Sequence, residues 1–123
     1  EEAVDRYLNG TISDLYDRML MKDMDKAIDI LQEKILEDKK IRVIGDYDID
    51  GVNATYILLE GLERLGADVD SDIPDRISDG YGLNRHLVER AYEAGVDTLI
   101  TCDNGIAAAD ETSGASIQSQ KNK

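Results

Sequence analysis

The chain has 123 residues, of which 41 % are hydrophobic and 33 % are charged, and its formal net charge at pH 7 is −13. This length can bury one hydrophobic core, and the sequence contains neither an apolar run that could cross a bilayer nor a secretory signal, so we expect a cytoplasmic protein. The acidity opposes unaided binding to nucleic acid, which relies on clustered Lys and Arg.

The first forty residues have a helical pattern. We expect residues 1–40 to form an N-terminal helical segment that packs on the domain after it. Residues 11–39 place apolar side chains on one helix face, Asp23 and Asp25 suit a helix start, and a short turn over residues 13–19 precedes it. The face consists of Leu20, Met24, Ala27, Ile28, Leu31 and Ile35.

A strand, an acidic turn and a helix follow. IRVIG, residues 41–45, is a short β-branched apolar run and predicts a buried strand. The aspartates of GDYDIDG come next, and a helix over residues 52–66 is predicted by apolar and small residues at helical spacing. These residues are Val52, Thr55, Leu59 and Leu62.

The alternation of strand and helix continues. Residues 67–73 predict a second strand near an edge of the sheet, stopped by Pro74, and the polar, glycine-containing residues 75–84 predict a loop. Asn84 can cap a helix that runs to Glu93. Its expected inward side chains are Leu87, Val88, Ala91 and Tyr92.

The last predicted strand is VDTLITCD, residues 96–103. It contains Cys102, the single cysteine, which excludes a disulfide within these residues and which we interpret as a packing residue. NGIAAADE, residues 104–111, is expected to open another helix. The remaining residues 112–123 are small and polar without periodicity, so we expect a flexible tail.

This alternation predicts an α/β fold with a mostly parallel sheet and flanking helices. Ligands of such sheets collect at the carboxyl ends of the strands. Asp46, Asp48 and Asp50 follow the first strand and Asp103 ends the third, so the four carboxylates converge if these strands are neighbours. Because like charges repel, the sequence predicts cations between them.

GDYDIDG also resembles the first half of a calcium-binding EF-hand loop. That loop needs a bidentate Glu at its final position, which is Ile57 here, and it lies between two helices rather than after a strand. The sequence therefore argues against an EF-hand.

Several motifs together carry a resemblance to a known family. MKDMDKAIDIL, IRVIGDYDIDG, IPDRISDGYGLN and ITCDNGI resemble the DHH phosphoesterase superfamily and, within it, the RecJ-like single-strand exonucleases. The resemblance runs from about Tyr7 to about Glu111. It implies a Rossmann-like α/β domain that hydrolyses phosphodiesters of single-stranded DNA in the 5′-to-3′ direction with two divalent cations, Mn²⁺ or Mg²⁺.

The resemblance also assigns site residues. Asp48 and Asp50 correspond to metal ligands of the family's first motif, and Asp46 either binds metal or supports the ligands. Asp103 corresponds to the aspartate that bridges the metals. Carboxylate oxygens are hard ligands and suit both Mg²⁺ and Mn²⁺.

One part of the family pattern is absent from the sequence. The Asp-His-His motif that names the superfamily does not occur in these residues. We therefore expect residues 41–111 to be a partial, truncated DHH domain with little or no nuclease activity in isolation. An incomplete sheet would leave an edge and an apolar face uncovered, so we also expect self-association.

Further residues are candidates for substrate binding. Arg76 could grip a phosphate, and a salt bridge to a carboxylate is as plausible. Tyr81 could stack on a base or pack in a turn, and Asn104 and Gly105 could aim backbone N–H groups at an anion. His86, the single histidine, lies away from the acidic turn, so we expect an exposed structural residue.

Three alternatives remain open at this point. A haloacid-dehalogenase-like phosphatase would use Asp46 as a nucleophile, but it does not explain PDRISDGYGLN. Another DHH phosphoesterase would act on short oligonucleotides or cyclic dinucleotides. A non-catalytic DHH-fold module would keep the fold for protein interaction without the activity.

Overall fold

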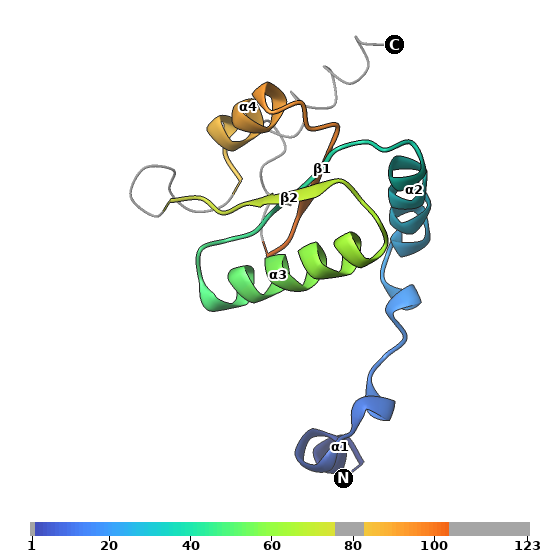
Figure 1. Ribbon diagram of the computed structural model, residues 1–123. Helices are drawn as coiled ribbons and strands as arrows, with labels where there is room; N and C mark the ends of the chain where they lie inside the picture. Colours follow the sequence, from blue (N-terminus) through green and yellow to red (C-terminus); the bar gives the residue numbers. More distant parts are fainter. Residues whose placement is uncertain (1, 76–82, 104–123) are drawn as a thin grey trace. The chain divides into compact units, whose positions relative to one another are not determined.

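The computed structural model describes residues 2–75 and 83–103. Residues up to Gln32 form one compact unit, and residues from Glu33 onward form a second. The order of elements, shown in Figure 1, is α1 (Glu2–Asn9), η1 (Ile12–Asp14), η2 (Arg18–Leu20), α2 (Met24–Leu36), β1 (Ile41–Ile44), α3 (Ile49–Arg64), β2 (Val69–Asp72), α4 (Arg85–Glu93) and β3 (Thr98–Thr101).

The N-terminal unit is helical but not one helix. The prediction of a helical pattern from residue 11 is wrong for the residues before Asp23. Two 3₁₀ turns, η1 and η2, form instead, in the region where a short turn over residues 13–19 was predicted. Local side-chain bonds explain the difference, because the Asp14 carboxylate accepts from Thr11 N at 2.8 Å and the Asp17 carboxylate accepts from Met19 N at 2.9 Å. A separate helix α1 was not predicted, and none of its described residues is buried.

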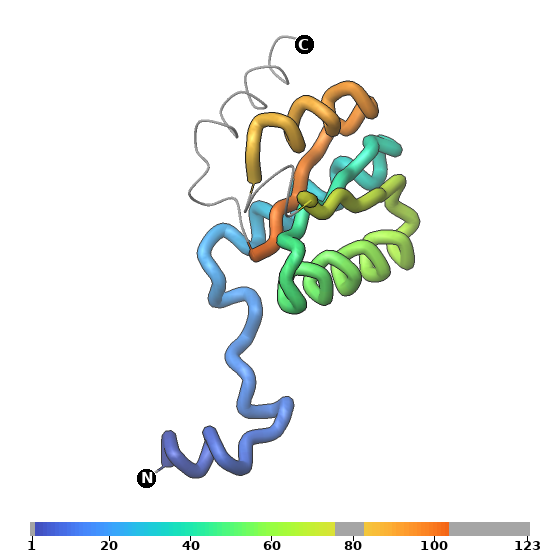
Figure 2. Tube along the Cα trace, turned by 90° about the vertical axis from the view of Figure 1, so that its left-hand side faces the viewer, coloured from blue at the N-terminus to red at the C-terminus, as the bar shows by residue number. Residues whose placement is uncertain are grey.

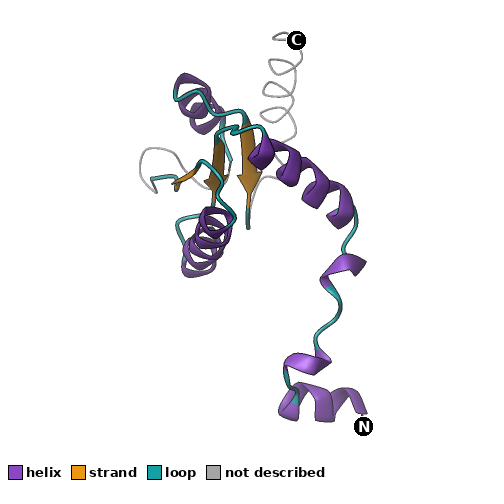
Figure 3. Ribbon diagram, turned by 45° about the vertical axis from the view of Figure 1, so that its right-hand side comes forward, coloured by secondary structure: helices purple, strands orange, loops and turns teal. Residues whose placement is uncertain are grey.

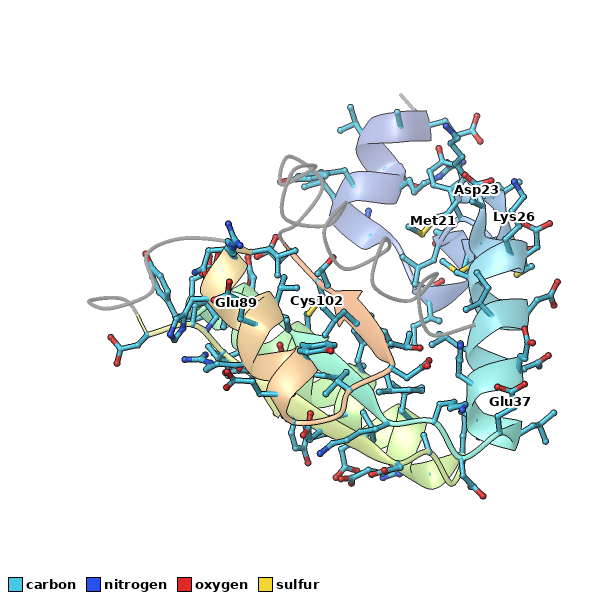
Figure 4. The ribbon with its side chains drawn as sticks, turned by 90° about the horizontal axis from the view of Figure 1, so that it is seen from above. Met21, Asp23, Lys26, Glu37, Glu89 and Cys102 are labelled. Atoms are coloured by element: carbon cyan, nitrogen blue, oxygen red, sulfur yellow. The ribbon has the colours of Figure 1, made fainter. Side chains whose placement is uncertain are left out.

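Helix α2 begins at the position that Asp23 and Asp25 predicted for a helix start. It starts at Met24, directly after Asp23, and Lys26 Nζ donates to the Asp23 carboxylate at 2.8 Å (Figure 4). The half-buried apolar residues of α2 lie on the predicted face, whereas Ala27 and Leu20 are exposed. These half-buried residues are Met24, Ile28, Leu31 and Ile35.

The second unit is built on a parallel sheet in the order β2-β1-β3. Ile44 of β1 is in register with Asp72 of β2 and with Thr101 of β3. Ile41 and Val43 of β1 are fully buried, as expected for a central parallel strand. The predicted α/β fold is confirmed, and β2 is an edge strand of the described sheet.

Helices α3 and α4 cover opposite faces of this sheet. Figure 3 shows the strands between the two helices, and the tube in Figure 2 shows the same arrangement from another side. Helix α3 packs on β1 and β2. On the other face, Ile44 forms a core with Leu83 and Leu87, against which Val88 and Leu99 pack.

Tyr92, which was predicted to face inward, is exposed, and so is Val52, one of the helically spaced residues of α3. Val52 of α3 is 42 % exposed and Tyr92 of α4 is 59 % exposed. Each follows a buried residue, Gly51 or Ala91, and so lies about 100° further round its helix. The narrow contact with the sheet leaves these positions in solvent.

Ion pairs tie the elements of this unit together. Arg42 of β1 donates to both carboxylate oxygens of Asp70 on β2, at 2.6 and 2.7 Å, and Arg90 of α4 donates to Asp72 at 2.9 Å. The hydrogen bond from Arg42 is the main reason why the pKa of Asp70 lies below its usual range. Lys34, in the last turns of α2, pairs with Asp97 at 2.9 Å.

Within residues 2–75 and 83–103, no helix is both long enough and apolar enough to span a membrane.

Candidate functional site

The direction in which the strands are added reverses between β1 and β3. The chain passes from β1 through α3 to β2 on one side, and β3 then lies on the other side of β1. Such a reversal of strand order marks the place where ligands bind in open parallel sheets, at the carboxyl ends of the strands. Asp46 lies two residues beyond the end of β1, and Asp103 lies two residues beyond the end of β3. The pairing of the two chain segments extends past the strand ends, because Cys102 N donates to the Ile44 carbonyl at 3.1 Å.

Asp46 is a buried carboxylate with an unpaired oxygen. The residue is 0 % exposed, and its Oδ1 accepts a hydrogen bond from Tyr47 N at 2.7 Å. Its Oδ2 has no hydrogen-bond partner among the described residues. Burying a charged group without compensation is costly, so this oxygen calls for a cation, a proton or a donor outside the described residues.

Asp48 and Asp50 build the start of α3. Asp48 is the N-cap, since its Oδ1 accepts from Gly51 N at 2.8 Å, and Asp50 lies in the first turn. Negative charge is favourable at this end of a helix because the N-terminal N–H groups carry partial positive charge. Both residues are exposed and therefore accessible from solvent.

Two glycines allow this turn to pack against the end of β1. A Cβ at Gly51 would lie 2.6 Å from Asp46 N and 2.5 Å from Asp46 O. A Cβ at Gly45 would lie 1.9 Å from Thr55 Oγ1 and 2.7 Å from the Gly51 carbonyl oxygen. A role for these glycines was not predicted, although they lie on either side of the acidic stretch, and glycines in such positions can indicate a close approach of the backbone.

Asp103 has an unusual backbone conformation. Its φ is 62°, in the left-handed region that non-glycine residues seldom adopt, and the residue is exposed. The preceding Cys102 is half-buried, and its sulfur, visible at the end of β3 in Figure 4, lies 3.5 Å from Thr55 Oγ1. This contact agrees with the interpretation of Cys102 as a packing residue.

The predicted residues share one edge of the sheet, but they do not form a closed cluster. Within residues 2–75 and 83–103, no group of three or more His, Cys, Asp or Glu side chains is arranged to hold a metal ion. Asp48 caps helix α3, whereas Asp46 is buried just after β1. His86 is exposed, as predicted.

The predicted substrate-binding residues, which are Arg76, Tyr81, Asn104 and Gly105, all lie outside the described residues.

Comparison with known proteins assigns the family. The sequence model described as "DHH family, N-terminal domain" matches residues 40–122, well over half of the chain. The chain belongs to the DHH family. The match includes β1, the acidic turn, β3 and the residues directly after it, and therefore all four candidate carboxylates.

Curated relatives in the DHH family are exonucleases. The chain is 41 % identical over 110 residues to the single-stranded-DNA-specific exonuclease RecJ of Bacillus subtilis, covering 89 % of this chain and 14 % of that protein. It is 44 % identical over 86 residues to the RecJ of Thermus thermophilus, covering 70 % of this chain and 13 % of that protein. The chain therefore spans about a seventh of the length of these relatives.

Solved structures show the same fold. A crystal structure of exonuclease RecJ bound to manganese matches with a TM-score of 0.66 and 43 % identity, over 70 % of this chain and 22 % of that one. A crystal structure of the Thermus thermophilus RecJ in complex with Mn²⁺ matches with a TM-score of 0.60 and 38 % identity, over 71 % of this chain and 12 % of that one. The fold of this chain is therefore that of the matched part of these exonucleases.

The residues at this edge fit a divalent cation. Asp46 Oδ2 is buried and lacks a partner among the described residues, and a cation would compensate its charge. The available donors are carboxylate oxygens, which are hard ligands of the kind that Mg²⁺ and Mn²⁺ prefer.

Proposed function

We propose that this chain is the N-terminal part of a DHH-family exonuclease that hydrolyses phosphodiester bonds of single-stranded DNA in the 5′-to-3′ direction. The observation that carries the proposal is the buried, unpaired oxygen of Asp46 at the reversal of strand order, within the segment that matches the DHH family. The two RecJ relatives, at 41 % and 44 % identity, support the choice of substrate.

The carboxylates have distinct proposed roles. Asp48, Asp50 and Asp103 bind Mn²⁺ or Mg²⁺, and Asp46 either binds metal through Oδ2 or supports the ligands. When bound, divalent cations polarise phosphoryl oxygens and lower the pKa of an attacking water. The chain itself sets the conformation of residues 45–51 through the Asp48 cap and the close backbone approach at Gly45 and Gly51. This conformation determines the positions of the carboxylates in that segment.

Substrate contacts are proposed for two further segments of the sequence, residues 76–81 and 104–105. Arg76 pairs with a phosphate, Tyr81 stacks on a base, and Asn104 and Gly105 direct backbone N–H groups at an anion. These roles follow from the resemblance and from the position of the segments in the sequence.

The organisation of the chain is part of the proposal. Residues 1–40 form a helical segment, residues 41–111 carry part of the phosphoesterase domain, and the sequence of residues 112–123 is small and polar. The protein acts in the cytoplasm, where single-stranded DNA is its partner, and the short chain self-associates.

Metal binding without DNA tests the proposal. In a titration of the 123-residue chain with Mn²⁺, followed by electron paramagnetic resonance of free Mn²⁺, Asp48→Asn and Asp103→Asn should each weaken binding more than about 10-fold. Glu89→Gln is the matched control, because it also removes one negative charge, on the exposed face of α4 (Figure 4). Equal affinity of all four proteins would contradict the proposed site.

A further inference from the structure

Thr55 is a buried hydroxyl at the junction of two strands and a helix. It lies in α3 and is 3 % exposed, and its Oγ1 donates to the Gly51 carbonyl oxygen at 2.7 Å. The same Oγ1 lies 3.5 Å from the sulfur of Cys102, which is 47 residues away in the sequence. It also occupies the space beside Gly45, since a Cβ built there would lie 1.9 Å from it.

Each contact of this hydroxyl precedes or follows a candidate carboxylate. Gly45 precedes Asp46, Gly51 follows Asp50, and Cys102 precedes Asp103. The hydroxyl therefore touches the three backbone segments that carry the predicted ligands. Among the described residues, the hydroxyl forms no hydrogen bond with any of the four carboxylates.

We propose that Thr55 is a positioning residue for the carboxylate site: its side chain sets the distance between the end of β1, the start of α3 and the end of β3. The inference rests on the proposed function, because it concerns the arrangement of the proposed metal ligands. Thr55 contacts neither metal nor substrate, and it acts through Gly45, Gly51 and Cys102.

The geometry separates this role from an ordinary helix hydrogen bond. Threonine in a helix often donates to the carbonyl four residues earlier, and that bond alone would be a local feature. In α3 the Gly51 carbonyl already accepts from Thr55 N through the helix pattern, so the hydroxyl is not needed to satisfy it. The contacts with Gly45 and Cys102 reach outside the helix, and they place Oγ1 between the residues that follow β1 and β3.

Isosteric replacement tests the inference. Thr55→Val keeps the shape but removes the hydroxyl, and Thr55→Ser keeps the hydroxyl. We expect Thr55→Val to weaken Mn²⁺ binding by the full chain about 10-fold, as for residues that orient metal ligands. We expect Thr55→Ser to bind Mn²⁺ with an affinity within about 2-fold of wild type, because it keeps the hydroxyl. Mn²⁺ affinity is read by electron paramagnetic resonance, and the unfolding temperature by circular dichroism.

Thr98→Val is the matched control. It makes the same chemical change at the opposite end of β3, where the Thr98 hydroxyl donates to Asp97 at 2.8 Å. Its Mn²⁺ affinity should equal that of wild type. Wild-type affinity in Thr55→Val, or equal weakening by Thr55→Val and Thr98→Val, would overturn the inference.

A second variant keeps the test decisive if Thr55→Val does not fold. Cys102→Ala leaves Thr55 intact and removes the sulfur next to Asp103, and it should weaken Mn²⁺ binding in the same direction. Unchanged affinity in Cys102→Ala would then overturn the inference. Absence of Mn²⁺ binding by the wild-type chain would instead overturn the proposed metal site, and with it this role of Thr55.

Discussion

Asp46 and its neighbours Asp48 and Asp50 are three carboxylates in very different surroundings. Asp46 is 0 % exposed with one oxygen unpaired among the described residues, whereas Asp48 and Asp50 are exposed at the start of α3. A buried charge is tolerated in proteins where a cation or hydrogen bonds compensate it. Because Asp46 is buried and the other two are exposed, the position of Asp46 should depend most on the groups packed around it at the end of β1.

The close approach of Gly51 to the backbone of Asp46 leaves no room for a side chain. A methyl group there would collide with the backbone of Asp46, 2.5 Å away, and backbone atoms cannot rotate aside. Gly51→Ala should therefore lower the free energy of unfolding by about 1–3 kcal/mol, as for other overpacked sites, and should weaken Mn²⁺ binding. Urea denaturation and the Mn²⁺ titration measure the two effects.

Gly61 provides the matched control in the same helix. A Cβ there would meet nothing within 4 Å, so Gly61→Ala should raise the free energy of unfolding by about 0.5–1 kcal/mol through the better helix propensity of alanine. Its Mn²⁺ affinity should not change. A Gly51→Ala protein as stable as Gly61→Ala would show that the close approach at Asp46 does not exist.

At the scale of elements, the ion pair between Arg42 and Asp70 joins β1 to β2. Its two hydrogen bonds, at 2.6 and 2.7 Å, hold the pKa of Asp70 below its usual range. Because the Asp70 side chain is 34 % exposed, water screens the pair. Asp70→Asn should lower the free energy of unfolding at neutral pH by about 1–2 kcal/mol, less than for a fully buried pair.

The pH dependence of this effect follows from the direction of the pKa shift. A carboxyl group with a lowered folded-state pKa contributes stability above its unfolded pKa of about 4, and this stability is lost as the pH falls through the folded-state value. The stability difference between wild type and Asp70→Asn, measured by urea denaturation, should shrink as the pH is lowered through this range. Glu89→Gln, in an exposed pair with Arg85, should change stability little at any pH. A difference for Asp70→Asn that does not vary with pH would contradict the account.

Local patterns in the sequence predicted the elements next to the site better than those far from it. The apolar run of β1 and the Asn84 cap of α4 are local signals, and the structure confirms both, with Asn84 Oδ1 accepting from Leu87 N at 3.0 Å. Only a short turn over residues 13–19 was predicted where the structure has two 3₁₀ turns, because these turns arise from competition between side-chain and helix hydrogen bonds. The contact of Thr55 with Cys102 was not predicted, because it depends on the strand order, which hydrophobic spacing does not specify.

At the scale of the whole molecule, the described sheet has two outer strands. β2 and β3 each pair on one side only among the described residues, and unpaired parallel edges can bind another chain. We expect concentration-dependent self-association in sedimentation velocity. Ser71→Lys, which adds a charge to an exposed residue of β2, should reduce it, whereas Ser13→Lys in η1 should not. A wild-type chain that stays monomeric at high concentration would refute this expectation.

The central claim is a divalent-cation site at the ends of β1 and β3, and paramagnetic broadening in nuclear magnetic resonance tests it most directly. When substoichiometric Mn²⁺ is added to the ¹⁵N-labelled chain, the amide signals of residues 45–51 and 102–103 should broaden first, before those of α4. The net charge of −13 makes diffuse binding the alternative to exclude. Broadening spread evenly over the acidic residues of both units would contradict the site, whereas selective loss at these two segments is the result predicted here.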